Sequence, residues 1–221
     1  MSMMSRPLPR LARRQALLLP MLALAGCSVL PNRPYQEVRR FTLSPQRPQA
    51  EPPPARGPVL LLRSLRAAPG LDARGLRSVS PDGQVSTSYW SEWTAAPPEL
   101  VEEAMRRWLA ASGIFSAVTA PGSRLTPDLV LEGELVRLQV EPAAGRASAA
   151  LSVLLLPQSQ GTGEARILGQ FMPEGTAPLP GGPRPRGELP PAEAAAAMTD
   201  ALAAALAALE RDLRAAVRTR R

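Results

Sequence analysis

The placement of proline most restricts where this chain can form regular structure. Seven of its 26 prolines lie between residues 28 and 57, and seven more, with four glycines, lie between 173 and 191. Proline fixes φ and has no backbone N–H, so such segments disfavour helix interiors and central strands. We expect the first segment to be an extended spacer in which residues 41–43 form a short edge strand, and the second to be loop.

Two amphipathic helices are predicted. The first opens at Pro97 and Pro98, carries glutamates in its first turns and ends at Gly113. Its apolar stripe is Leu100, Val101, Ala104, Met105, Trp108 and Leu109. The second follows Pro191, and eleven of residues 192–208 are alanine. Its stripe is Met198, Leu202, Leu206, Leu209, Leu213 and Val217. We favour packing of this stripe on the chain's own sheet over a membrane or partner helix.

Short apolar or alternating segments predict the strands. They are residues 59–62, 85–90, 114–118, 129–140, 149–155 and 167–171. The alternation in 129–140 changes phase around Gly133, which predicts a bulge. Together with the helices, these strands predict an α+β fold: a single, mainly antiparallel sheet with two helices packed on one face.

The first 26 residues have the pattern of a secretory signal. Four arginines precede an apolar run at 16–25, which as a helix is about 15 Å long and too short to span a bilayer core of about 30 Å. The run ends in Leu24-Ala25-Gly26-Cys27, which resembles a bacterial lipobox. An ordinary signal peptide with a chance cysteine is the alternative.

The lipobox predicts a signal peptide at 1–26, a lipidated Cys27 with a proline-rich linker at 27–56, and a domain at 57–217. Ser28 follows the cysteine, where aspartate is the usual signal for retention in the inner membrane. The resemblance to this sorting rule favours the outer membrane, with the domain facing the periplasm. The acyl chains of such a protein anchor it almost permanently.

Composition excludes several functional classes. The chain has no histidine, so it holds no Ser-His-Asp or Cys-His machinery and lacks the residue used in most zinc sites. Its single cysteine allows no intramolecular disulfide. Removal of the four signal arginines lowers the formal charge from +7 to +3, and no arginine cluster is interleaved with aromatics. We therefore expect no metal, no cofactor and no nucleic-acid partner.

Two groups of residues remain as candidate sites. Glu132 and Glu134 lie two apart on a strand and so share a face; a solvated strand face is favoured over a catalytic carboxylate pair. The scarce aromatics gather at Tyr89, Trp90, Trp93 and Trp108. Trp108 belongs to the helix stripe, whereas Trp90 and Trp93 are either core residues or a contact surface for a partner.

The order of these features resembles the ABC-type transport auxiliary lipoprotein family. The matching segments are the lipobox at 24–27, Phe41-Thr42-Leu43-Ser44-Pro45, Gly57-Pro58-Val59-Leu60, Ala68-Pro69-Gly70-Leu71-Asp72, the Tyr89-Trp90 to Pro97-Pro98 lead into the first helix, Ser112-Gly113-Ile114-Phe115 after it, and Leu131-Glu132-Gly133-Glu134-Leu135. The chain departs from the family at Leu156-Pro157 and at 173–191, so the pairing of the last strands is not predicted.

This resemblance implies a non-enzymatic, lipid-anchored component of an intermembrane phospholipid transport system. In such systems an ABC ATPase, its permease and an MCE-domain (mammalian cell entry) protein move phospholipids between two membranes. The lipoprotein would hold the MCE-domain partner at the outer membrane. The resemblance is also compatible with several copies of the lipoprotein assembling around a tubular partner. Two alternatives are a lipoprotein chaperone or assembly factor for an outer-membrane barrel protein, and a periplasmic hydrolase using Glu132 or Glu134.

Overall fold

The computed structural model describes residues 35–158, 167–184 and 189–219. The predicted signal segment at 1–26 and Cys27 lie outside this part of the chain, as do residues 159–166. All helices and strands described below belong to one compact unit, Glu37–Arg221. Residues 37–56, which we expected to be linker, are therefore part of the unit; Leu43 among them is buried in the core.

The unit contains ten strands and two α-helices among the described residues. The strands are β1 (Arg39–Phe41), β2 (Val59–Leu62), β3 (Arg66–Ala67), β4 (Gly75–Val79), β5 (Val85–Trp93), β6 (Ala117–Thr119), β7 (Leu129–Glu141), β8 (Arg146–Pro157), β9 (Gly169–Phe171) and β10 (Glu174–Pro178). The helices are α3 (Pro97–Ala110) and α4 (Pro191–Arg218), and a 3₁₀ turn, η2 (Pro142–Ala144), joins β7 to β8.

The long strand β7 organises the sheet. One of its edges pairs with β8 along nearly its whole length, and β10 and β9 cover the far edge of β8. The other edge of β7 pairs in turn with β2, β3 and β4. Beyond these lie β6 next to β2, β5 next to β4, and β1 next to β5. Every strand thus belongs to one continuous ten-stranded sheet.

The sheet is mixed, which differs from the mainly antiparallel sheet that we expected. Of the nine strand pairings described, five are parallel, although the longest, β7 with β8, is antiparallel. Parallel neighbours need a long connection, and the chain from β3 through α3 supplies one between β2 and the strands beside it, β6 and β7. The apolar pattern of a strand does not encode its direction.

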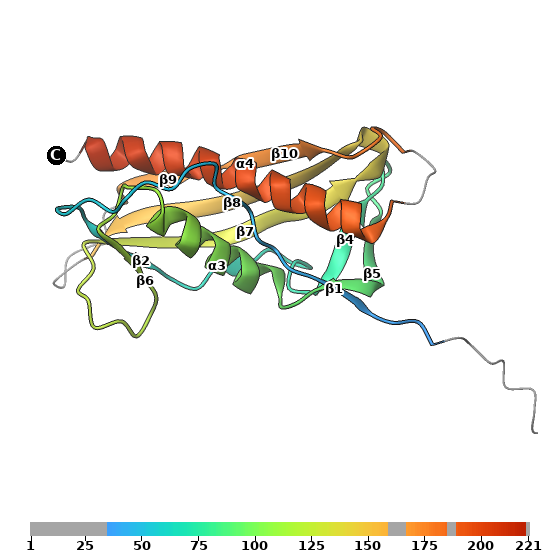
Figure 1. The fold of residues 1–221 in the computed structure, drawn as a ribbon, viewed down its shortest axis with the longest axis horizontal. Coiled ribbons are helices and arrows are strands. Elements are labelled where there is room, and N and C mark those ends of the chain that lie inside the picture. The colour runs from blue at the N-terminus through green and yellow to red at the C-terminus, as the bar shows by residue number, and fades with distance from the viewer. Residues whose placement is uncertain (1–34, 159–166, 185–188, 220–221) are drawn as a thin grey trace, which may run out of the picture. The chain divides into compact units, whose positions relative to one another are not determined.

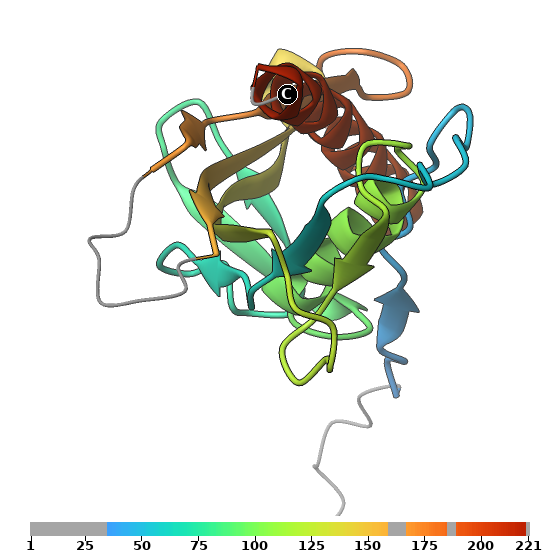
Figure 2. The ribbon, with the colours of Figure 1, turned by 90° about the vertical axis from the view of Figure 1, so that its left-hand side faces the viewer.

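Both helices cover the same face of the sheet, as predicted (Figure 1). Figure 2 shows α4 nearly end-on, with the strands curving around the two helices. The predicted stripe of α4 is buried in full: Met198, Leu202, Leu206, Leu209, Leu213 and Val217. By length and composition alone α4 could cross a membrane. Its apolar face instead packs on β8 and β10.

Strand β10 lies where a loop was expected. Prolines precede it and end it, yet residues 174–178 pair with β8 in antiparallel register. A Cβ on Gly175 would lie 2.2 Å from the carbonyl oxygen of Ala201 and 2.3 Å from the amide nitrogen of Ala205. The alanine-rich face of α4 thus packs on the strand backbone, and tertiary packing overrides the loop tendency of the segment.

Two further details differ from expectation. The register of β7 shifts between Leu135 and Arg137, so its bulge comes at Val136 and not at Gly133. Strand β4 was not anticipated at all. It is short and its side chains are mostly half-buried, so its pattern carries little apolar signal.

Candidate functional site

A bulge in β5 creates the most unusual surface of the unit. Along β4, Gly75 pairs with Glu92 and Arg77 pairs with Thr87. Two positions on β4 therefore correspond to five on β5, which leaves three extra residues in β5. Bulges re-aim side chains and interrupt pairing. Here the extra residues come from the segment that contains Tyr89 and Trp90.

Gly75 makes room for this bulge. A Cβ at this position would lie 2.2 Å from the carbonyl oxygen of Ser88 and 2.5 Å from Cγ2 of Thr87. These distances are shorter than any relaxed contact, and the first involves backbone that cannot rotate away. A side chain on β4 would thus force the bulge to move.

The bulge presents Tyr89 and Trp90 to solvent as a packed pair. Tyr89 is 78% exposed and Trp90 is 40% exposed. Their ring centroids are 4.8 Å apart with an angle of 82° between the planes, an edge-to-face arrangement that aromatic rings favour. Two large aromatic rings in water beside each other form a ready contact surface.

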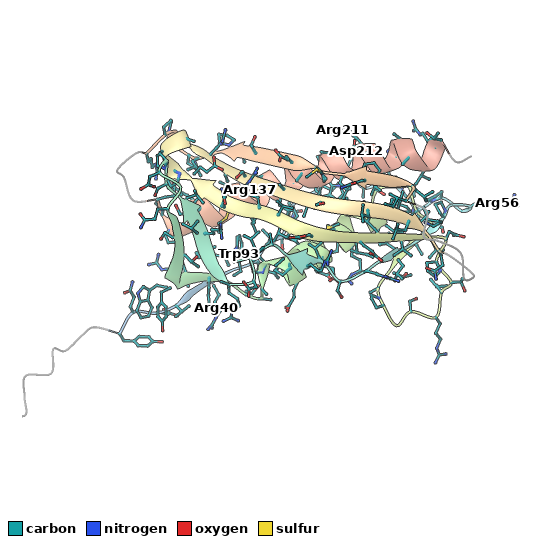
Figure 3. All side chains as sticks on the ribbon, turned by 180° about the vertical axis from the view of Figure 1, so that it is seen from behind. Arg40, Arg56, Trp93, Arg137, Arg211 and Asp212 are labelled. Atoms are coloured by element: carbon teal, nitrogen blue, oxygen red, sulfur yellow. The ribbon has the colours of Figure 1, made fainter. Side chains whose placement is uncertain are left out.

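The structure separates the two tryptophans that we considered either core residues or a contact surface for a partner. Trp90 is exposed, but Trp93 is 1% exposed and lies in the hydrophobic core. Figure 3 labels Trp93 near the end of the sheet that carries β1. The expectation for Trp93 is corrected accordingly, because the bulge ends before it and returns β5 to its inward phase. Of the two, only Trp90 presents a contact surface.

Beneath the bulge lies a cavity of ≈ 350 Å³. The inner side of the bulge contributes Ser88 and Ser91, β4 contributes Leu76 and Ser78, and the start of α4 contributes Pro191 and Ala194. Ser91 is 4% exposed. The cavity is lined by hydroxyls and apolar groups without a charged side chain, so it provides neither an acid, nor a base, nor a cation.

Charges near the bulge are nearly balanced. Nε of Arg40 and Nη2 of Arg74 both donate to Oε1 of Glu92, at 2.9 and 2.7 Å. Arg39 pairs in register with Ser91 at the edge of the sheet and is exposed. With Glu37, the surface around the bulge holds three guanidinium groups against two carboxylates.

A second polar cluster holds the segment before β2 against both helices. The carboxylate of Glu210 accepts hydrogen bonds from Arg47 at 2.9 and 3.0 Å, from the indole of Trp108 at 2.8 Å and from Arg214 at 2.8 Å. Arg214 also donates to the carbonyl oxygen of Ser112 at 2.7 Å. Local sequence patterns do not predict this cluster, because its members are far apart along the chain.

The cluster keeps Glu210 ionised. Burial works against the charged form, but hydrogen bonds from Arg47, Arg214 and Trp108 outweigh it and lower the pKa of the Glu210 carboxyl. The same contact with Glu210 raises the pKa of Arg47. These donors satisfy the Glu210 carboxylate, while Nη1 of Arg47 is buried without a hydrogen-bond partner among the described residues. The cluster is thus a structural clamp.

The glutamates considered as a carboxylate pair lie on the other face of the sheet. Glu132 forms an ion pair with Arg63, the residue after β2, and both carboxylates are half-buried on the face opposite the helices. Figure 3 views this face, on which it labels Arg137. Within residues 35–158, 167–184 and 189–219, no group of three or more Cys, Asp or Glu side chains is placed to hold a metal ion.

Comparison with known proteins shows the fold. No family model matches the chain, and no curated protein matches it. One similar solved structure is that of a Xanthomonas campestris protein whose description names the family DUF330. The likeness covers 82% of this chain and 98% of that protein, with 19% sequence identity and a TM-score of 0.65. A second solved structure, of an uncharacterized protein, covers 80% of this chain and 99% of its own, with 13% identity and a TM-score of 0.56. At these identities the likeness is one of fold.

Proposed function

We propose that this protein is a lipid-anchored, non-enzymatic auxiliary component of an ABC/MCE-type intermembrane phospholipid transport system. In this proposal Cys27 carries the acyl chains, the outer membrane holds the anchor, and the domain faces the periplasm. Its partners are the MCE-domain protein and, through it, the ABC permease and ATPase.

The observation that carries the proposal is the position of the family-like segments in the fold. Tyr89 to Pro98, one of these segments, contains the exposed pair of the bulge and leads directly into α3. The segment after α3, residues 112–115, directly precedes β6, and residues 131–135 lie within β7. A scaffold that displays a small aromatic surface near its proposed lipid anchor suits a protein that holds other components at a membrane.

The hydrolase alternative receives no support from the carboxylates that suggested it. A catalytic acid or base requires a cleft that shields it from water. Glu132 instead lies on the open face of the sheet, paired with Arg63.

The test is recovery of the lipidated protein from its native envelope under mild detergent, followed by mass spectrometry. We expect the MCE-domain protein together with the ABC ATPase and permease. The control is the same preparation from cells that express the protein without an affinity tag. Recovery of an outer-membrane barrel protein without ABC components would contradict the proposal and favour the chaperone alternative.

Whether the protein acts as a homo-oligomer is tested separately. Chemical cross-linking in the intact envelope, before detergent is added, should yield ladders of the chain if rings form around a tubular partner. A single monomer band, with the MCE-domain protein still recovered, would refute the homo-oligomer and leave the adaptor role standing.

A further inference from the structure

The aromatic pair on the β5 bulge lies next to the point where the chain enters the domain. β1 and β5 run parallel, with Arg39 opposite Ser91 and Phe41 opposite Trp93. The pairing begins at Arg39 and Ser91, and Ser91 directly follows Trp90 in β5. The chain therefore enters the sheet next to the exposed aromatic pair.

The distance from this point to the predicted anchor is short. Nine residues lie between Cys27 and Glu37, and the ten steps from one Cα to the next span at most about 36 Å in a fully extended chain. Acyl chains on Cys27 would hold the end of the domain that carries β1 and β5 within this distance of the bilayer surface. The bulge is thereby confined near the membrane, whatever path the intervening residues take.

The chemistry of the bulge suits a bilayer interface. Tyrosine and tryptophan are enriched at the headgroup level of membranes, where one end of the ring system is apolar and the other can bond to water. Val85 on the same strand is also exposed, and its side chain adds aliphatic surface. Arg39 is exposed beside the bulge and adds positive charge that suits an anionic lipid surface.

We propose that Tyr89 and Trp90 insert into the headgroup region of the membrane that carries the lipid anchor. This inference rests on the acylation of Cys27 that the proposed function includes, and it names the occupant of the exposed aromatic site. The two rings orient the domain on the membrane, so the opposite end, at the C-terminus of α4, points away from the membrane. The MCE-domain partner then binds a different part of the surface.

Tryptophan fluorescence tests this directly, because the chain has only three tryptophans and two are buried. The lipidated protein is reconstituted into phosphatidylethanolamine and phosphatidylglycerol vesicles, with and without bromine on the acyl chains. Bromine quenches indoles that enter the bilayer. Wild type should lose roughly a third of its emission, the share of one tryptophan in three, and Trp90→Phe should lose almost none. Equal quenching in wild type and Trp90→Phe would overturn the proposal.

Cross-linking separates lipid from protein as the occupant. A benzophenone amino acid replaces Tyr89 and, as a control, replaces Ile167, which is 56% exposed and precedes β9. Irradiation of intact envelopes should attach phospholipid to position 89 and not to position 167. Attachment of position 89 to a protein would overturn membrane docking and assign the aromatic pair to a protein partner.

The failure of this inference and the failure of the proposed function have different signatures. Mass spectrometry of the N-terminal peptide reports whether Cys27 is acylated. An unmodified Cys27 removes the anchor, and with it both proposals. An acylated Cys27 without quenching at Trp90 removes only the docking of the aromatic pair.

Discussion

The indole Nε1 of Trp108 donates a hydrogen bond of 2.8 Å to Oε2 of Glu210 and so joins α3 to α4 across 102 positions of sequence. The same carboxylate binds Arg47, from the segment that leads to β2. Three distant parts of the chain thus share one buried charge. This arrangement fixes the start of the domain against its helices.

Replacement of Glu210 tests that clamp. Glu210→Gln keeps the size of the side chain but removes its charge, leaving Arg47 and Arg214 with a weaker acceptor. We expect the free energy of unfolding, measured in urea at neutral pH, to fall by about 1–3 kcal/mol. Asp212→Asn is the control: it lies on the same helix but is exposed, and Figure 3 labels it beside Arg211. Equal effects of the two substitutions would show that the cluster contributes nothing specific.

The lowered pKa of Glu210 also predicts a pH dependence. A carboxyl whose pKa is lower in the folded state stabilises the fold above its unfolded pKa, which is about 4.3 for glutamate. This stabilisation is lost as the pH falls through the folded pKa. Below about pH 4.3 the free energy of unfolding should therefore fall more steeply for wild type than for Glu210→Gln. Parallel profiles in urea titrations at several pH values would refute the role of Glu210.

The contact between β10 and α4 predicts a strong effect of any side chain at Gly175. Gly175→Ala places a methyl group against the backbone at Ala201 and Ala205, so the helix must move off the strand. We expect the free energy of unfolding, from thermal or urea denaturation, to fall by about 2–4 kcal/mol. Thr176→Val, on the neighbouring exposed position of the same strand, should change stability by less than about 0.5 kcal/mol. A free energy of unfolding for Gly175→Ala equal to that of wild type would contradict the close packing of α4 on β10.

Gly75 offers a way to move the bulge without touching its aromatic rings. Gly75→Ala pushes against the backbone of Ser88, so the bulge must shift. We expect a loss of about 1–3 kcal/mol in stability and a changed emission spectrum of Trp90. Ser78→Ala on the same strand is the control. To assign the spectral change to Trp90, both substitutions are repeated in Trp90→Phe, where the change should vanish.

The anchor itself is tested at Cys27. Cys27→Ala removes the sulfur proposed to carry the acyl chains, so the chain should keep its predicted signal segment and appear without acyl mass in intact-protein mass spectrometry. Ser28→Ala serves as the control and should leave acylation unchanged. Normal processing of Cys27→Ala would mean that the N-terminal segment is an ordinary secretory signal.

Local periodicity predicted the helices well and the strand pairing poorly. The stripe from Met198 to Val217 emerges as a buried face because a helix brings residues three and four apart together, whatever it packs against. The direction of β2 beside β7 depends on how the chain returns through α3, and no residue in either strand records it. Strand β10 likewise forms only because β8 and α4 enclose it.

The sequence by itself determined the apolar faces of both helices and the gathering of aromatics before α3, since each depends on neighbours within a few residues. Only the tertiary structure decided which aromatics face water. Trp90 and Trp93 are three positions apart in one strand, and the bulge that contains Trp90 and ends before Trp93 is defined by pairing with β4, whose Gly75 leaves the space for it. Exposure of a side chain is a property of such distant pairings, and short-range pattern carries no record of them.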